Sequence, residues 1–251
     1  MSRRGTHAKK KKKGPMRLIL LILSLGAIIA CAIYMITWSK ANSENQAVLE
    51  SIKQETIQTN QETGEAVIDF EKLFAKNKDT IGWLTVNNTS IDYPVVKGND
   101  NDFYLTHNFN KESNLGGWLF ADYRMKADGT DKNLVIHGHN MKNGSMFGTL
   151  KKVLNKDWYE NSENLEITYQ TAEKEYKYKV FSIYQIEVES YYTKRNFASN
   201  QEYQEFLNKI KGRSKKDFGI NLSVSDKIMT LSTCASNDNY RVVLHAVLSN
   251  D

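Results

Sequence analysis

The chain has 251 residues, 40% of them hydrophobic, which is enough for one good-sized core, so we expect one main folded domain. The formal net charge of +5 is unevenly distributed. Residues 1–17 contain eight of the 34 Lys and Arg residues and no acid, so the rest of the chain, with 26 basic and 29 acidic residues, is slightly acidic. The one basic cluster outside this tail, at residues 211–216, is typical of a solvated loop, and nucleic-acid binding is therefore disfavoured.

Residues 18–38 contain no Asp, Glu, Lys or Arg, and a helix of this length spans the ~30 Å hydrocarbon layer of a bilayer. We predict a single-pass membrane anchor here. By the positive-inside rule, residues 1–17 form a cytoplasmic tail and the rest of the chain lies outside the cell, with Trp38 at the interface. The alternative is a cleaved signal peptide, which needs a shorter apolar core and a small-residue cleavage site. Ser39-Lys40-Ala41 matches such a site poorly.

The segment after the anchor, residues 39–66, is polar and is predicted to be a spacer with some helix. Apolar residues then recur at helical spacing in residues 67–76, which predicts a short helix that docks on the body. We place the start of the extracellular domain at residue 67 and its end at residue 251.

The pattern changes after this helix to short segments rich in β-branched and aromatic residues, bounded by Asn, Gly and Asp. They predict a mainly β domain of about eight strands. Two helical segments interrupt it, at residues 146–154 and 200–211, and the second lies between two strands. The predicted strands cover residues 81–86, 89–96, 116–122, 133–139, 164–170, 176–188, 227–234 and 240–248.

Cys234 is the single cysteine of the predicted extracellular domain, because Cys31 lies inside the membrane span. A lone thiol in an oxidising compartment is a candidate reactive residue, although a buried, inert cysteine is an open alternative. Cys234 ends a predicted strand just before a turn-rich segment. Arg241 starts the next strand, so both side chains can face one cleft.

A nucleophilic thiol needs a base or a cation beside it. Of the five histidines, His245 lies inside a strand and is typical of a core residue, whereas His137 and His139 end the apolar strand at residues 133–139. Gly138 offers backbone freedom between them, and Asn140 is a candidate for orienting a ring. A metal site is an alternative, but no further ligands lie nearby in the sequence, and we predict neither metal nor cofactor.

The segment Thr-Leu-Ser-Thr-Cys at residues 230–234 closely resembles the Thr-Leu-x-Thr-Cys signature of sortases. The Ile-His-Gly-His-Asn segment resembles their histidine-containing segment, with the second histidine at the catalytic position, and Arg241 corresponds to the active-site arginine. The resemblance covers residues 68–251 and has features of class B. It implies an eight-stranded sortase β-barrel with N-terminal helices outside it and a helix inserted before the last two strands.

The resemblance also implies a function: a membrane-anchored cysteine transpeptidase with His139, Cys234 and Arg241 as catalytic residues. Such an enzyme cleaves a C-terminal pentapeptide sorting signal of a secreted protein after Thr and joins the protein to an amine of peptidoglycan or its lipid-linked precursor. Matching positions imply substrate contacts at Asn101, Leu105, Tyr192 and Ser232. Two alternatives remain at this point, an extracellular thiol hydrolase using the same Cys-His pair and a catalytically silent, membrane-tethered binding module.

Overall fold

The computed structural model describes residues 16–59, 64, 66–126, 131–234 and 239–249, and at Cys234 it describes the backbone without the side chain. The chain divides into two units, one ending at Lys40 and the other comprising Ala41–Asp251. Helix α1 (Met16–Thr56) contributes to both. Within the described residues, α1 is the one helix that is long and apolar enough to cross a membrane, which is consistent with a membrane anchor.

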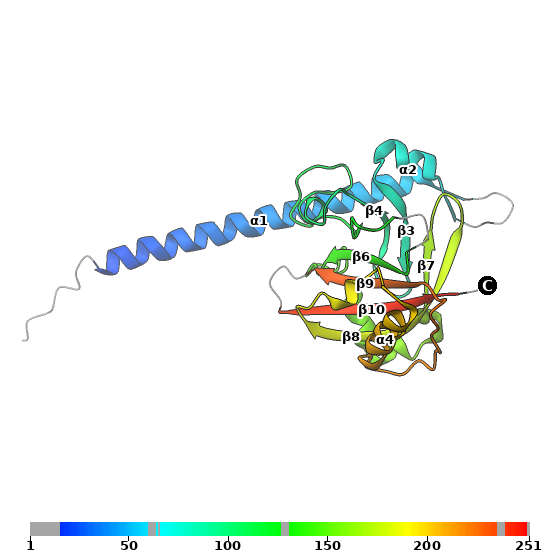
Figure 1. The fold of residues 1–251 in the computed structure, drawn as a ribbon. Helices are drawn as coiled ribbons and strands as arrows, with labels where there is room; N and C mark the ends of the chain where they lie inside the picture. Colours follow the sequence, from blue (N-terminus) through cyan, green and yellow to red (C-terminus); the bar gives the residue numbers. More distant parts are fainter. Residues whose placement is uncertain (1–15, 60–63, 65, 127–130, 235–238, 250–251) are drawn as a thin grey trace, which may run out of the picture. The chain divides into compact units, whose positions relative to one another are not determined.

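The second unit is built on a closed, mixed β-barrel with the strand order β10-β8-β7-β3-β4-β5-β6-β9 (Figure 1). All eight predicted strands are therefore confirmed. Two neighbouring pairs, β4 with β5 and β6 with β9, are parallel, and the others are antiparallel. The strands are β3 (Thr80–Val86), β4 (Asp92–Val96), β5 (Phe120–Ala121), β6 (Asn133–His139), β7 (Glu166–Gln170), β8 (Glu175–Glu187), β9 (Ile228–Cys234) and β10 (Tyr240–Leu248).

The predicted helix at residues 67–76 is shorter in the structure, where α2 comprises Phe70–Lys76. The Asp69 side chain caps it by accepting a hydrogen bond from the Lys72 N–H at 3.1 Å, which fixes the start of the helix. The two residues at the start of the predicted helix belong instead to β2 (Ala66–Ile68), which pairs with β1 (Ile57–Thr59) in a separate two-stranded sheet.

The predicted helix at residues 146–154 begins later than expected. The φ of Met146 is 51°, which lies in the left-handed region, so a right-handed helix cannot begin there. Only Leu150–Leu154 is helical, as the 3₁₀ helix η2. The other short helices are η1 (Phe103–Leu105), α3 (Lys156–Tyr159), η3 (Ser162–Leu165) and η4 (Tyr191–Thr193).

The second predicted helical segment is present as α4 (Asn200–Gly212), between β8 and β9 as expected. Ser199 caps it through a hydrogen bond from the Glu202 N–H to its hydroxyl, 3.1 Å long. The apolar residues of α4 form a buried cluster with Ile228 of β9 and Val243 of β10. Since the interior of an eight-stranded barrel has room only for side chains, α4 covers the outer face of these strands.

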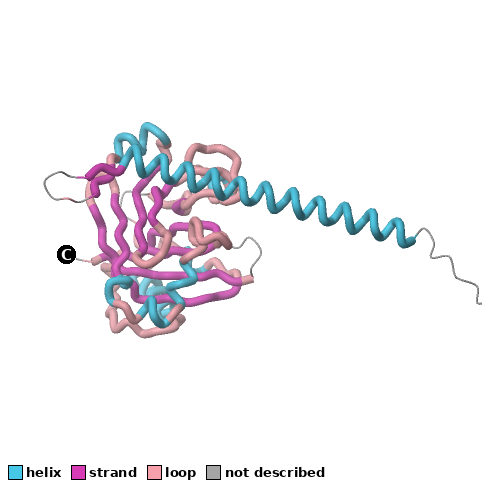
Figure 2. Tube along the Cα trace, turned by 180° about the vertical axis from the view of Figure 1, so that it is seen from behind, coloured by secondary structure: helices cyan, strands magenta, loops and turns pink. Residues whose placement is uncertain are grey.

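The segment predicted as a polar spacer, residues 39–66, is largely helical, because α1 continues to Thr56. From Ala41 onward this helix belongs to the compact second unit, where it buries Leu49 and Ile52. Asn45 Nδ2 donates to the Gly117 carbonyl oxygen at 3.0 Å, and Asn114 Nδ2 donates to the Ala41 carbonyl oxygen at 2.9 Å. The folded unit thus begins 26 residues before the predicted domain start. Helices and loops surround the strands on several sides (Figure 2).

Candidate active site

Strands β6, β9 and β10 lie side by side and bring the three predicted catalytic positions together. In the parallel β6–β9 pair, His139 is the register partner of Cys234. In the antiparallel β9–β10 pair, Val243 is opposite Ser232, and continuing that register by two residues brings Arg241 level with Cys234. Neighbouring strands are about 4.8 Å apart, so the three backbone positions are adjacent.

The face that these residues share follows from strand alternation. Ile228 and Val243 pack under α4 on the outer face of the barrel. Residues separated by an even number of positions along a strand point to the same face. Ser232 and Cys234 on β9 and Arg241 on β10 therefore also belong to the outer face. The candidate site is therefore on the outside of the barrel, where a polypeptide substrate can reach it.

His139 is oriented by a backbone carbonyl. Its Nε2 lies 2.8 Å from the Leu105 carbonyl oxygen, which can only accept, so Nε2 carries a hydrogen. Its Nδ1 is buried and has no hydrogen-bond partner among the described residues. In the neutral ring Nδ1 is thus the nitrogen with a free lone pair, which suits a proton acceptor. The carbonyl of Leu105 takes the orienting role that the sequence suggested for Asn140.

Glycine is required at position 138 because a larger residue would not fit, and not because the backbone needs the freedom that the sequence suggested. A Cβ at this position would lie 2.3 Å from Leu119 Cδ2 and 2.9 Å from Phe147 Cγ. Both of these side chains are fully buried and have little room to move. A side chain at 138 would push β6 outward immediately before His139.

His137 lies on the same face of β6, with Ser232 as its register partner. Burial lowers the pKa of His137 to about 4; Asp122 opposes this shift, and the guanidinium groups of Arg241 and Arg124 add to it. His137 is thus neutral near pH 7.

His245 is a core residue, as predicted. Its ring is fully buried between the Tyr184 hydroxyl at Nε2 and the Thr230 hydroxyl at Nδ1, each 2.8 Å away.

Arg241 is half-buried, and its Nη1 is buried without a hydrogen-bond partner among the described residues. The structure gives it no carboxylate within the described part of the chain, and Asp238, the partner that a purely structural role would use, lies outside the described residues. A buried guanidinium N–H that lacks a protein acceptor is suited to an oxygen of a bound substrate.

A groove of about 510 Å³ opens on this face; we call it the active-site groove. Arg241, Ser232 and His137 line it, and so do the other residues predicted to contact substrate, Asn101, Leu105 and Tyr192. The Tyr192 hydroxyl lies 3.0 Å from the Ser232 hydroxyl, which joins η4 to β9 across the groove. The four predicted substrate-binding residues, distant in sequence, are thus gathered in one groove.

Among the groove residues that sequence reasoning missed are Asp122 and Arg124, which follow β5. Asn101 contacts the same segment, because its Oδ1 accepts a hydrogen bond from the Tyr123 N–H at 2.9 Å. An acidic and a basic residue at the end of the predicted strand at 116–122 and just after it were the sequence feature that could have identified them. Within the described residues, no group of three or more His, Cys, Asp or Glu side chains is placed to hold a metal ion.

Comparison with known proteins agrees with this geometry. The family model for the sortase domain matches residues 84–249. The Sortase B of Listeria monocytogenes is 36% identical over 205 residues, which cover 79% of this chain and 81% of the relative. The Sortase B of Staphylococcus aureus is 34% identical over 165 residues, covering 66% and 67%.

Solved structures show the same relationship. Sortase B from Bacillus anthracis in complex with AAEK1 aligns with a TM-score of 0.75 at 33% identity, covering 84% of this chain and 99% of that one. A Staphylococcus aureus sortase B–substrate complex aligns with a TM-score of 0.68 at 29% identity, covering 88% and 98%. The chain therefore belongs to the sortase family of cysteine transpeptidases, within class B.

Proposed function

We propose that this sortase uses Cys234, His139 and Arg241 to cleave a sorting signal after Thr and to transfer the protein to a cell-wall amine. The observation that carries this assignment is the alignment of His139 with Cys234 on adjacent parallel strands, with His139 Nδ1 left unpartnered among the described residues. A thiol that ends a strand beside such a nitrogen has both the position and the base that a nucleophile needs.

The proton balance of the first half-reaction runs through His139. Nδ1 takes the proton of the Cys234 thiol, and the thiolate sulfur attacks the carbonyl carbon of the Thr residue. The C–N bond of the peptide then breaks as the imidazolium gives its proton to the leaving amine, and a thioester forms. The Leu105 carbonyl keeps the ring aligned in both protonation states, since it accepts from Nε2 throughout.

The second half-reaction reverses these steps with a different amine. The incoming amine attacks the thioester carbonyl, loses a proton to His139, and displaces the thiolate as the new amide forms. An amine of a peptidoglycan cross-bridge, or of its lipid-linked precursor, is the proposed acceptor. If water took its place, the same residues would perform hydrolysis.

Arg241 has the role of stabilising the oxygen that becomes negative in each tetrahedral intermediate. Its Nη1, which has no hydrogen-bond partner in the described part of the chain, supports this role, since a charge-assisted hydrogen bond strengthens as the negative charge develops. Loss of one such donor typically costs about 3 kcal/mol in the transition state. Asn101, Leu105, Tyr192 and Ser232 are the proposed contacts for the sorting signal, because they line the groove that leads to Arg241.

We place the catalytic unit outside the cell, with residues 1–17 in the cytoplasm and residues 18–38 as the anchor. The basic residues before the apolar segment support this orientation. Protease added to intact cells should degrade the catalytic unit, and its protection would contradict the orientation.

The function is tested with the full-length chain in detergent micelles and a library of peptides that contain pentapeptides with Thr in the fourth position. A mass increase of the protein by an acyl fragment that ends in Thr, absent in Cys234→Ala, is the expected result. Release of that fragment as an amide on addition of an amine distinguishes transfer from hydrolysis. Failure of every peptide to form a thioester would contradict the proposal.

A further inference from the structure

Arg124 is held in one orientation by a buried carboxylate. The Asp122 side chain is 1% exposed; its Oδ1 accepts from Arg124 Nε at 2.7 Å, and its Oδ2 accepts from Nη2. Burial by itself would raise the pKa of Asp122, but the hydrogen bonds from Arg124 outweigh it and leave that pKa lowered. A guanidinium held by two parallel hydrogen bonds cannot rotate, so the direction of its remaining N–H groups is set in advance.

The N–H groups of this arginine that do not bond Asp122, among them both on Nη1, are available to a ligand. Asp122 uses Nε and Nη2, and Nη1 has no hydrogen-bond partner among the described residues. The Arg124 side chain is 41% exposed. Because its charge is already balanced by Asp122, Nη1 suits a neutral acceptor such as a peptide carbonyl oxygen at least as well as an anion.

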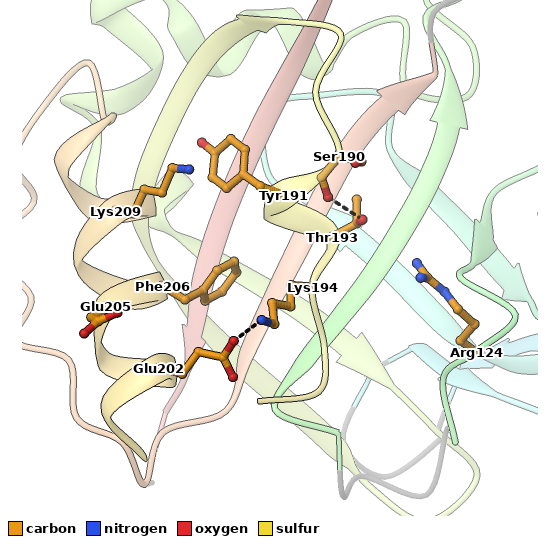
Figure 3. A pocket seen from close by; sticks show the side chains of 9 residues that line it. All are labelled: Arg124, Ser190, Tyr191, Thr193, Lys194, Glu202, Glu205, Phe206 and Lys209. Atoms are coloured by element: carbon orange, nitrogen blue, oxygen red, sulfur yellow. Dashed lines mark hydrogen bonds and ion pairs between the residues drawn. The ribbon is translucent and has the colours of Figure 1, made fainter. Parts of the chain in front are cut away.

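Arg124 stands where two hollows meet. It lines the active-site groove and also a second hollow of about 500 Å³ beside α4, which we call the α4 hollow. Ser190 and Thr193 are likewise shared by both. Figure 3 shows Arg124 on the segment that follows β5, with η4 between it and α4. The two hollows thus form one path from Arg241, past Arg124, to the side chains of α4.

Two charged groups of the α4 hollow are paired with each other, and a third lies over an aromatic ring. Lys194 forms an ion pair with Glu202 (Figure 3), and the Lys209 ammonium lies 3.8 Å from the centre of the Tyr191 ring. Tyr191 and Phe206 supply aromatic surface to the same hollow. With Lys194 paired to Glu202, Arg124 paired to Asp122 and two aromatic rings on its surface, the hollow suits an extended polypeptide.

The placement of the acid–base residue indicates which part of a substrate would occupy this path. Both the leaving and the incoming amine have to lie next to His139, whereas the active-site groove is lined by Arg241, the proposed contact of the Thr carbonyl oxygen. The groove instead leaves the site from Arg241 and Ser232. It therefore runs on the acyl side of the scissile bond, where the residues that precede Thr are located.

We propose that the α4 hollow binds the segment of the donor protein that precedes its sorting signal, with Arg124 Nη1 donating to a main-chain carbonyl oxygen of that segment. This inference rests on the proposed function. On this proposal the enzyme recognises a segment of the donor protein that is longer than the pentapeptide, and Asp122 is a positioning residue for Arg124.

The test compares two donor peptides that carry the same pentapeptide, one of them extended upstream by six Gly and Ser residues. Acylation of the full-length chain in detergent micelles is measured as kcat/KM. We expect the extended peptide to react roughly 10-fold better, the gain from one charge-assisted hydrogen bond, mainly through a lower KM. Arg124→Ala and Arg124→Lys should each lose this advantage, so that the short and the extended peptide react within about twofold of each other in either variant, whatever its rate with the short peptide.

Arg195→Ala is the matched control. The Arg195 side chain is half-buried and lines neither the α4 hollow nor the active-site groove. This variant should keep the length advantage. The Lys variant retains a cation opposite Asp122, which protects the fold if the Ala variant is unstable.

Equal reactivity of the two peptides with the wild-type chain, or a length advantage that survives both Arg124 variants, would overturn the inference while leaving the proposed function intact. So would a defect confined to transfer to the amine, because it would place the acceptor in the hollow. Absence of a thioester with either peptide would instead reject the proposed function, and this inference with it.

Discussion

Substitution of Gly138 by Ala tests how the barrel core positions His139, the proposed catalytic histidine. The added Cβ would lie 2.3 Å from Leu119 Cδ2 and 2.9 Å from Phe147 Cγ, whereas carbon atoms in ordinary contact are about 3.5–4.0 Å apart. Relief of the closer contact needs a displacement of more than about 1 Å, shared between β6 and two fully buried side chains. His139 is the next residue and has to move with the strand.

The expected effects are a loss of stability and a loss of rate. Overpacking of this kind costs about 1–3 kcal/mol, offset by roughly 0.5–1 kcal/mol because Ala restricts the unfolded chain more than Gly does. We therefore expect the free energy of unfolding to fall by about 1–2 kcal/mol. A displacement of about 1 Å at a catalytic group can cost up to ~100-fold in rate, so acylation should slow by roughly 10- to 100-fold.

Urea denaturation monitored by tryptophan fluorescence measures the first effect, and mass spectrometry of thioester formation measures the second. Gly212→Ala is the matched control, because a Cβ at that position meets no atom within 4 Å and the backbone there is not left-handed. It should leave both quantities near their wild-type values. Wild-type stability and acylation in Gly138→Ala would refute the packing argument, and lost stability with normal acylation would show that the strain is relieved away from His139.

Four further predictions follow from the site and the fold. His139→Ala should abolish acylation while His137→Ala retains most of it, since only the former supplies the base; equal losses would contradict the assignment. Arg241→Lys should lose most of the acylation rate despite keeping the charge, because an ammonium cannot reproduce the planar guanidinium, and near wild-type acylation would remove Arg241 from the catalytic set. Ile52→Ala should lower the free energy of unfolding by about 2–5 kcal/mol, since this side chain is 1% exposed, whereas the exposed Gln54→Ala on the same helix should not. Burial lowers the pKa of His137 to about 4 and that of His245 to about 3, whereas a histidine of the unfolded chain has a pKa of about 6.5. Below pH 6.5 the unfolded chain therefore binds more protons than the folded chain. The urea concentration at the unfolding midpoint should fall as the pH is lowered from 7 to 4.5.

The sequence by itself determined the class of the protein. Alternating apolar residues are a local property, so all eight barrel strands could be predicted from them, as could α4 from its helical spacing. The long apolar segment near the N-terminus predicted the one helix of the described chain that could span a membrane. The signature at residues 230–234 pointed to the sortase family, which the family model and the relatives confirm.

Local patterns were less reliable at element boundaries. The start of α2 depended on the Asp69 cap, and the late start of η2 depended on the positive φ of Met146. For residues 39–66 the sequence predicted a spacer with only some helix, and the full continuation of α1 to Thr56 was missed because its buried residues are few and partly polar, among them Asn42 and Asn45. Asn45 Nδ2 donates to the Gly117 carbonyl oxygen, a contact with a distant loop that no local pattern reveals.

Only the tertiary structure decided how the site is assembled. The parallel pairing of β6 with β9 joins segments about 95 residues apart and sets His139 beside Cys234. The orienting carbonyl of Leu105 comes from a third segment, and the second hollow beside Arg124 needs η4 and α4 together. A backbone carbonyl is present at every residue, and a register is a relation between strands. Neither can be predicted from the identity of single residues, because both are set only when the barrel closes.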